Sequence, residues 1–299
     1  MRSLLFVPAD SDRKLAKSLT CGADALILDL EDSVTSEHKD VARSNASKFL
    51  NENLDRATKT RRMQIYVRIN DLQSSYWRAD LDAVVAAGPD GIMLPKPRSG
   101  ADVAALSAAL RSAEQQAGRE RTHISIIAIA TETPGSLLNM ASYIGASARL
   151  TGLCWGAEDL GTALGAQSNR DGSGRFTSPY LLARNLCLVT AAAAEVQAID
   201  TVFTDFRNDE GLRAEAEEAA RDGFTGKLAI HPAQVPIINE MFTPSAANIE
   251  MAQQIVAAFK SKGGKGAVSL NGRMLDRPHL VQAQKLLTRA ALTSSGNEA

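Results

Sequence analysis

Two acidic residues, Glu132 and Asp159, follow closely on short apolar runs of the sequence, at residues 124–130 and 150–155. If these runs are neighbouring parallel strands, about 4.8 Å apart, both carboxylates lie within reach of one cation. Mg²⁺ prefers hard oxygen ligands and is often held by one or two carboxylates, with water and substrate oxygens in the other positions. The acids therefore indicate a Mg²⁺ site with room for a chelating 2-keto or 2-hydroxy acid. Alternatively, each acid caps the helix that follows it, and spacing alone favours neither interpretation.

Arg68 ends another apolar run and is expected at the same edge of the predicted sheet. Its planar guanidinium grips a carboxylate at two points and keeps its charge at working pH, which suits a binder of a carboxylate or enolate oxygen. It is equally suited to a buried salt bridge with Glu31 or Asp32, which follow the second run, and such a pair would also orient the arginine. We interpret Glu31 and Asp32 as residues that orient their neighbours rather than as catalysts.

Basic side chains at two places have competing interpretations. Lys96 follows the fourth run and either forms a Schiff base, which needs a lowered pKa, or balances the charge of the carboxylates; the many acids favour the second role. Arg13, Lys14 and Lys17 recur at helical spacing after the first run. They form either a patch for the phosphates of coenzyme A or an exposed helix face, and the sequence alone slightly favours the exposed face.

Eight short apolar runs would position these side chains. Most are apolar at every position, as expected of strands buried on both faces of a parallel sheet, and Ala-rich amphipathic segments lie between them. The runs are residues 3–7, 25–30, 64–69, 91–94, 124–130, 150–155, 199–204 and 226–230. This alternation predicts an α/β fold, a (β/α)₈ TIM barrel, with its active site at the carboxyl ends of the strands. On this pattern Asp205 would stand at the mouth after the seventh strand.

The main alternative is a doubly wound open sheet, which normally carries a glycine-rich phosphate loop after its first strand. Residues 8–12 (PADSD) occupy that position and contain no glycine. We therefore predict two parts, a TIM barrel catalytic domain at residues 1–235 and a C-terminal helical extension at residues 236–299.

Composition and charge limit the class of protein. The net charge is −1, from 33 basic and 34 acidic residues, which argues against nucleic acid as the main partner because such proteins usually have a basic face. No apolar run approaches the ~20 residues of a membrane helix, and we find no export signal. The three cysteines, Cys21, Cys154 and Cys187, are too scattered for a metal or redox motif. We expect a cytoplasmic protein with reduced thiols.

Several motifs occur in the order in which one known family carries them. They are residues 2–9 (RSLLFVPA), 29–34 (DLEDSV), 94–96 (LPK), 129–134 (IATETP), 156–160 (GAEDL) and 227–232 (KLAIHP). With these motifs the chain resembles the citrate lyase beta-subunit-like proteins of the HpcH/HpaI aldolase superfamily, from residue 2 to about residue 290.

The resemblance implies a Mg²⁺-dependent barrel, usually a homotrimer, that makes or breaks a carbon–carbon bond in citryl-, malyl- or citramalyl-CoA. The two molecules that are joined or released are acetyl-CoA and a 2-keto acid. Glu132 and Asp159 resemble the metal ligands, and Glu132 thereby also contacts substrate. Arg68 resembles the residue that grips the keto acid. Asp276, in residues 272–276 (GRMLD), resembles a catalytic acid that some members deliver across a subunit boundary.

Other functions stay open at this point. A malyl-CoA thioesterase or a malate synthase-like enzyme would use the same site, and a thioesterase would release free malate instead of glyoxylate and acetyl-CoA. An aldolase for free keto acids would not bind acetyl-CoA. A non-catalytic subunit that binds CoA esters is a further alternative, but such a module has little need for the pair of acids and the arginine.

Overall fold

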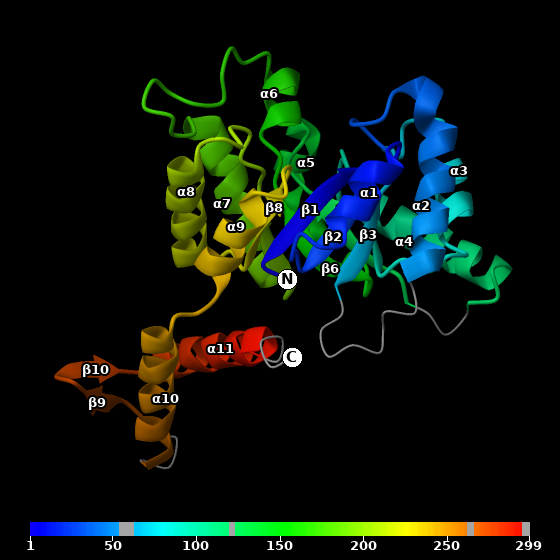
Figure 1. The fold of residues 1–299 in the computed structure, drawn as a ribbon. Coiled ribbons are helices and arrows are strands. Elements are labelled where there is room, and N and C mark those ends of the chain that lie inside the picture. The colour runs from blue at the N-terminus through cyan, green and yellow to red at the C-terminus, as the bar shows by residue number, and fades with distance from the viewer. Residues whose placement is uncertain (54–62, 120–122, 262–265, 295–299) are drawn as a thin grey trace.

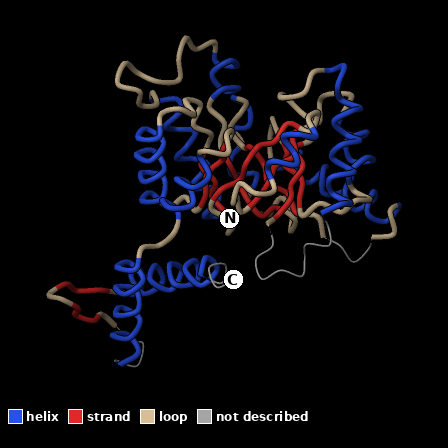
Figure 2. Tube along the Cα trace, in the orientation of Figure 1, coloured by secondary structure: helices blue, strands red, loops and turns tan. Residues whose placement is uncertain are grey.

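Eight parallel strands close into a barrel in a computed structural model that describes residues 1–53, 63–119, 123–261 and 266–294 (Figures 1 and 2). The strands are β1 (Ser3–Pro8), β2 (Ala25–Asp29), β3 (Gln64–Arg68), β4 (Gly91–Leu94), β5 (Ser125–Ile129), β6 (Leu150–Cys154), β7 (Gln197–Asp200) and β8 (Gly226–Ala229). Each strand pairs with the next one along the chain, and β8 closes on β1. The predicted TIM barrel is confirmed.

Helices cover the outside of the barrel, as Figure 2 shows with the strands at the centre. They are α1 (Asp12–Ser18), α2 (Lys39–Asn53), α3 (Trp77–Val84), α4 (Gly100–Gln116), α5 (Pro134–Leu138), α6 (Glu158–Leu164), α7 (Ser178–Ala193), α8 (Asp209–Asp222) and α9 (Gln234–Phe242), with short 3₁₀ turns at Ser36–His38 and Met140–Tyr143. Within the described ranges no helix has the length and apolar character needed to cross a bilayer.

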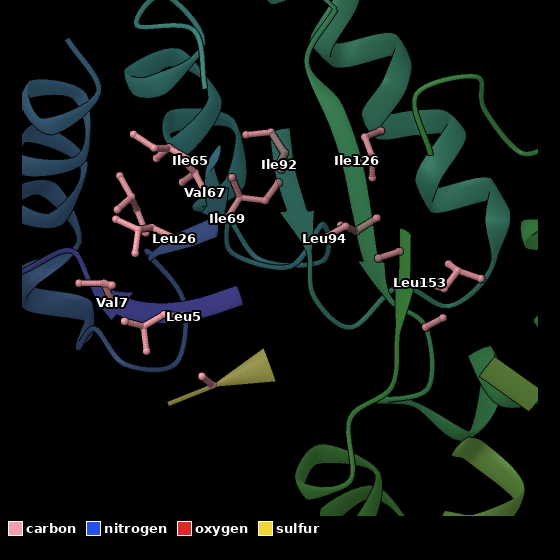
Figure 3. Close-up of a cluster of buried hydrophobic side chains, with 14 of the residues drawn as sticks. Leu5, Val7, Leu26, Ile65, Val67, Ile69, Ile92, Leu94, Ile126 and Leu153 are labelled. Atoms are coloured by element: carbon pink, nitrogen blue, oxygen red, sulfur yellow. The ribbon is translucent and has the colours of Figure 1, made fainter. Parts of the chain in front are cut away.

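The strands are apolar at nearly every position because both of their faces are buried. One set of side chains fills the interior of the barrel, including Leu4, Ile27, Met93, Ile127 and Leu228. The alternate set packs between the strands and the helices; Figure 3 shows Leu5, Val7, Leu26, Val67, Ile92 and Ile126 among its members. Successive residues of a strand point to opposite faces, so a continuous apolar run marks two cores at once.

The seventh strand lies earlier in the chain than the sequence predicts. The expected run was 199–204, whereas β7 covers Gln197–Asp200. Asp200 ends the strand and is buried, and Asp205 lies in an exposed loop, so the prediction that Asp205 stands at the mouth is wrong. After the strand, Val202 packs against the interior of the barrel and Phe203 joins the core outside it, although neither belongs to the sheet. Apolar periodicity cannot separate these environments from a strand.

The C-terminal part of the chain stands apart from the barrel on the side away from the carboxyl ends of the strands (Figure 1). It consists of α10 (Ala246–Ser261), a hairpin of β9 (Val268–Leu270) and β10 (Arg273–Leu275), and α11 (Arg277–Ser294). Phe259, Val268 and Leu275 form a small core of its own. The extension is therefore not purely helical. The proposed boundary at residue 235 falls inside α9, which packs on α8 and β8 and belongs to the barrel.

Candidate active site

A cavity of about 310 Å³ opens at the carboxyl ends of the strands. This is the end of a TIM barrel at which loops bring residues from several strands together. Its lining residues come from segments that are distant in the sequence, and they include Phe6, Asp29, Arg68, Glu132, Trp155 and Asp159. The cavity therefore contains the arginine and both acids that the sequence singles out as a candidate site.

Arg68 is fixed by a two-point ion pair with Asp29. Both residues end their strands, β3 and β2, and they are direct partners in the strand register. Asp29 Oδ1 accepts a hydrogen bond from Arg68 Nε at 2.7 Å, and Asp29 Oδ2 accepts one from Arg68 Nη2 at 2.7 Å. Burial alone would lower the pKa of Arg68, but the negative charge of Asp29 outweighs burial and raises it. The guanidinium is thus a permanent, immobile positive charge in the cavity wall.

Asp29 itself is nearly inaccessible to solvent. It accepts backbone N–H bonds from Glu31 at 3.0 Å and from Ser33 at 3.2 Å, in addition to the two from Arg68. Burial acts to raise the pKa of Asp29, but Arg68 and the N–H donors together hold this pKa below its ordinary value. The carboxylate is therefore ionised and satisfied at neutral pH, and it shapes the turn that carries Glu31.

Lys96 links the acids of the β2 loop to the acid after β6. Its Nζ is in close contact with Glu31, lies 2.9 Å from Asp32 and lies 3.4 Å from Asp159. Arg68 Nη1 completes the cluster at 3.0 Å from Glu31 Oε2. Burial acts to lower the pKa of Lys96, but the acids outweigh burial and raise it. A Schiff-base lysine needs the opposite shift, which supports the charge-balancing role expected of Lys96.

Glu132 is almost fully buried, three residues beyond the end of β5. Its Oε2 accepts the backbone N–H of Lys96 at 2.6 Å. Lys96 has a left-handed backbone, φ 49°, which is uncommon for a residue with a side chain and marks a functional constraint. The next residue, Thr133, caps α5, because its side chain accepts the N–H of Ser136. Glu132 is thus held between a strand and a helix start while its other oxygen faces the cavity wall near Gly156.

Gly156 leaves the space that the Glu132 side chain occupies. A Cβ on this glycine would lie 2.8 Å from Glu132 Cγ and 3.3 Å from Glu132 Oε1. Burial raises the pKa of Glu132 well above its ordinary value, and the negative charge of Asp159 is the second cause of this rise. Two carboxyl groups that repel each other in a partly dry pocket favour a cation between them.

The donors present fit a hard divalent cation. Within the described ranges no cluster of three or more His, Cys, Asp or Glu side chains forms a metal site, so a closed site of the zinc type is not built here. Two carboxyl groups, Glu132 and Asp159, line one cavity that has further space. Mg²⁺ usually keeps several waters or substrate oxygens beside one or two carboxylates, and this donor set matches that preference.

Four other candidate residues lie outside this cluster. Arg13, Lys14 and Lys17 are exposed on α1, whose first turn follows the mouth end of β1, and they are not among the lining residues of the cavity. Asp276 lies just before α11, is mostly exposed and pairs with His279 at 2.6 Å. Asp276 lies between β10 and α11, in the extension that stands away from the mouth (Figure 1), and it is not among the lining residues of the cavity of its own chain.

The arrangement has known counterparts. A family model described as HpcH/HpaI aldolase/citrate lyase matches residues 2–232. The chain belongs to this family. A (3S)-malyl-CoA thioesterase from Cereibacter sphaeroides is 36% identical, over 97% of this chain and 94% of that protein. The mitochondrial citramalyl-CoA lyase of Mus musculus is 35% identical, over 97% of this chain and 86% of that protein.

A solved family structure agrees with the fold over nearly the whole chain. It is protein CitE from Mycobacterium tuberculosis in complex with magnesium, acetoacetate and coenzyme A. The two structures superimpose with a TM-score of 0.77 and 32% sequence identity, and the match covers 97% of this chain and 100% of that one. The similarity therefore includes the C-terminal extension, which the family model does not cover.

The sequence predicts one ion-pair partner of Arg68 correctly and misses another. The ion pair with Glu31 is confirmed, but Asp32 pairs with Lys96 and not with Arg68. No role was given to Asp29, although it holds Arg68 more tightly than Glu31 does. The available signal was a charged residue at the last position of an otherwise apolar strand, since a buried carboxylate needs a cation.

We expect Arg68→Gln to reverse how Asp29 contributes to stability as the pH changes. In the unaltered protein the lowered pKa of Asp29 means that the ion pair stabilises the fold above the ordinary aspartate pKa and ceases to do so as the pH falls through the lowered value. Without Arg68, only the N–H donors of Glu31 and Ser33 offset burial, so the charged carboxylate destabilises the fold by about 3–5 kcal/mol near pH 7. Lowering the pH protonates Asp29 and recovers part of this loss.

Urea unfolding near pH 7 and near pH 4.5 measures the difference. Arg98→Gln is the matched control, because Arg98 is exposed and pairs only at the surface with Asp102; its effect should stay within about 1 kcal/mol at either pH. An equal loss of stability for Arg68→Gln at both pH values would contradict the assigned ion pair.

Proposed function

We propose that this chain is a Mg²⁺-dependent carbon–carbon lyase for a short hydroxyacyl-CoA ester, such as citryl-, malyl- or citramalyl-CoA. The products are acetyl-CoA and a 2-keto acid, and the reaction is reversible. The observation that carries the proposal is the placement of Glu132 and Asp159 in one cavity together with the fixed guanidinium of Arg68. Family membership supports the same reaction class.

Glu132 and Asp159 are the residues that would hold the ion. When bound, Mg²⁺ would hold oxygen atoms of the keto-acid portion and stabilise the negative charge that develops there. The raised pKa of Glu132, caused first by burial and then by Asp159, fits a carboxyl group that is poised to exchange a proton for a metal ion. Glu31, Asp32 and Lys96 would keep the surrounding charges in place.

Arg68 would bind the carboxylate or keto oxygen of the substrate. Its position is set before substrate arrives, because Asp29 already holds two of its nitrogens. A preorganised charge is most effective in a site from which water is excluded, and Arg68 is largely buried, with its guanidinium 4.7 Å from the ring of Phe6. Arg68 therefore contributes both to binding and to stabilisation of the transition state.

Cleavage requires the removal of one proton from the substrate and the addition of one proton to the product. A base takes the proton of the substrate hydroxyl, and the bond between the hydroxyl-bearing carbon and the carbon next to the thioester breaks. The keto acid leaves, and the electron pair of the broken bond passes to the thioester as an enolate. That enolate takes up a proton at carbon and becomes acetyl-CoA. A positioned acid–base group at such a step typically contributes ~10²–10⁴-fold in rate.

The coenzyme A portion would lie across the start of α1. Arg13 and Lys14 are exposed in its first turn, next to the mouth end of β1, and would pair with the phosphates. Both residues point to solvent, so they would contribute mainly to KM rather than to kcat.

Asp276 would act in a neighbouring subunit. It does not reach the cavity of its own chain, and the extension that carries it has its own core and stands away from the barrel (Figure 1). In a homotrimer such an extension can cover the mouth of the next barrel, where Asp276 would transfer the proton at the acetyl carbon.

A cytoplasmic location suits the three unpaired cysteines, Cys21, Cys154 and Cys187.

Thioester hydrolysis is the second candidate. It is favoured by one observation, the 36% identity with a protein named (3S)-malyl-CoA thioesterase. Incubation with citryl-, malyl- and citramalyl-CoA in the presence of Mg²⁺, followed by mass spectrometry of the products, separates the two reactions. Acetyl-CoA with a 2-keto acid supports the lyase, whereas free CoA with an intact hydroxy acid supports the thioesterase and would end the lyase proposal.

We expect Glu132→Gln and Asp159→Asn each to lose Mg²⁺ binding and at least ~10²-fold in turnover, because each removes one of two charged ligands. Titration calorimetry with Mg²⁺ and steady-state assays measure the two effects. Glu37→Gln is the control, since Glu37 is an exposed acid that is not among the lining residues of the cavity. Full turnover of the unaltered enzyme in excess EDTA would refute the metal assignment.

We expect Asp276→Asn to keep the fold and keto-acid binding and to lose carbon–carbon chemistry, because it removes only a proton-transfer group. Mixing Asp276→Asn with Glu132→Gln subunits tests the route across the boundary. Hetero-oligomers would regain activity at the barrels that combine an intact Glu132 with an Asp276 from another subunit. Normal turnover of Asp276→Asn alone would show that the C-terminal segment only packs.

A further inference from the structure

Lys227 is a fully buried charge that the proposed mechanism does not use. It lies on β8, and its neighbour Leu228 points into the barrel, so Lys227 points outward, under α8. Its Nζ lies 2.6 Å from Asp200 Oδ2 at the end of β7 and 2.8 Å from Glu215 Oε1 on α8. Burial alone would lower the pKa of Lys227, but the two carboxylates outweigh burial and raise it. Lys227 is thus a charged centre that joins two elements.

One connection from Lys227 leads to the wall of the cavity. The second oxygen of Asp200, Oδ1, accepts the indole N–H of Trp155 at 2.7 Å. Trp155 lines the cavity and directly precedes Gly156, the residue whose missing side chain leaves room for Glu132. The position of the indole therefore fixes the start of the 155–159 segment.

The other connection leads to the end of the same segment. The second oxygen of Glu215, Oε2, accepts a hydrogen bond from Arg170 Nη2 at 2.8 Å. Arg170 pairs with Phe176 in a small antiparallel hairpin, where Thr177 N also donates to Asn169 O. Asn169 Nδ2 in turn donates to Glu158 Oε1 at 2.8 Å, one residue before Asp159.

The two connections also meet through packed rings. The Arg170 guanidinium lies 3.8 Å from the centre of the Phe176 ring. Phe176 packs edge-on against Trp155, with 4.9 Å between the ring centres. Arg170 is therefore linked to both ends of the 155–159 segment, through Asn169 at one end and through Phe176 at the other.

We propose that Lys227, with Asp200, Glu215 and Arg170, forms a positioning network that holds the 155–159 segment at both ends and so sets the place of Asp159. The proposal rests on the proposed function, in which Asp159 is a metal ligand. A buried ion pair by itself is weak evidence for any role, because its desolvation cost offsets its attraction. Here Asp200 and Glu215 each use one oxygen for Lys227. Asp200 uses the other for Trp155, which begins the segment, and Glu215 uses the other for Arg170, which reaches the segment through Asn169 and Phe176. Outer partners of this kind orient metal ligands.

Arg170→Gln tests the network, because replacing Lys227 leaves the buried carboxylate of Asp200 without a cation and is expected to unfold the protein. The matched control is Arg175→Gln in the same hairpin, since Arg175 is exposed and its carboxylate partner is the neighbouring Asp171. Both changes are made in a Trp77→Phe background, in which Trp155 is the only tryptophan of the chain.

We expect Arg170→Gln to shift the Trp155 emission to longer wavelength and to raise the Mg²⁺ concentration at half-saturation roughly tenfold, the usual range for a lost outer partner. Arg170→Lys, which keeps a charge near Glu215, should fall between this variant and the unaltered protein. Arg175→Gln should match the unaltered protein in both measurements. A lower Tm for Arg170→Gln with unchanged emission and unchanged half-saturation would overturn the proposal, because a purely structural role predicts that result.

The same titrations separate this proposal from the function on which it rests. If Asp159→Asn binds Mg²⁺ as the unaltered protein does, the metal site itself is refuted and the proposed effect on Asp159 falls with it. If Asp159→Asn loses Mg²⁺ while Arg170→Gln retains full affinity, the metal site stands and only the positioning network is refuted.

Discussion

The mouth of this barrel depends on the ion pair between Arg68 and Asp29. Both side chains leave water almost completely, and such a pair is tolerated only when each charge meets a partner of good geometry. The strand register supplies that geometry, because Asp29 and Arg68 are directly opposite at the ends of neighbouring strands. Once this pair is formed, Glu31 is held against the remaining guanidinium nitrogen, and Lys96 is held against Glu31. The rest of the site is therefore built outward from one fixed cation.

The charges around that pair explain why the site suits a divalent ion. Among the described residues at the mouth, carboxyl groups outnumber basic ones; the acids are Asp29, Glu31, Asp32, Glu132, Glu158 and Asp159, and the bases that pair with them are Arg68 and Lys96. Each basic group is already shared among acids, so the excess of negative charge remains nearest to Glu132 and Asp159. The pKa of Glu132 is raised first by burial and then by the negative charge of Asp159. A bound cation would relieve both the repulsion and the cost of burial.

The layer outside the barrel repeats the same principle. Charges alternate in sign along the contacts from Asp200 to Lys227, Glu215 and Arg170. Each of the two carboxylates has a hydrogen-bond partner at both of its oxygens. A buried polar network of this kind favours one arrangement when it is fully satisfied and is costly when it is not. The network therefore favours one fixed position for each of the segments that it joins. The network in the mouth contacts the segment that carries Asp159 through Lys96. The network beneath α8 contacts the same segment at Trp155 and, through Asn169, at Glu158.

The sequence by itself determined the barrel and the kinds of side chain at its mouth. Continuous apolar runs arise from burial, which is a local property of each strand. Because the carboxyl ends of parallel strands share one edge, Arg68, Glu132 and Asp159 were expected together. The tertiary structure decided which groups pair. Strand register pairs Arg68 with Asp29 rather than with Asp32, and β7 ends at Asp200 rather than near Asp205. Lys96 lies among three acids from two loops, Glu31, Asp32 and Asp159. It also set Asp276 apart from its own cavity. Pairing depends on distances between segments that are remote along the chain, and periodicity carries no information about those distances.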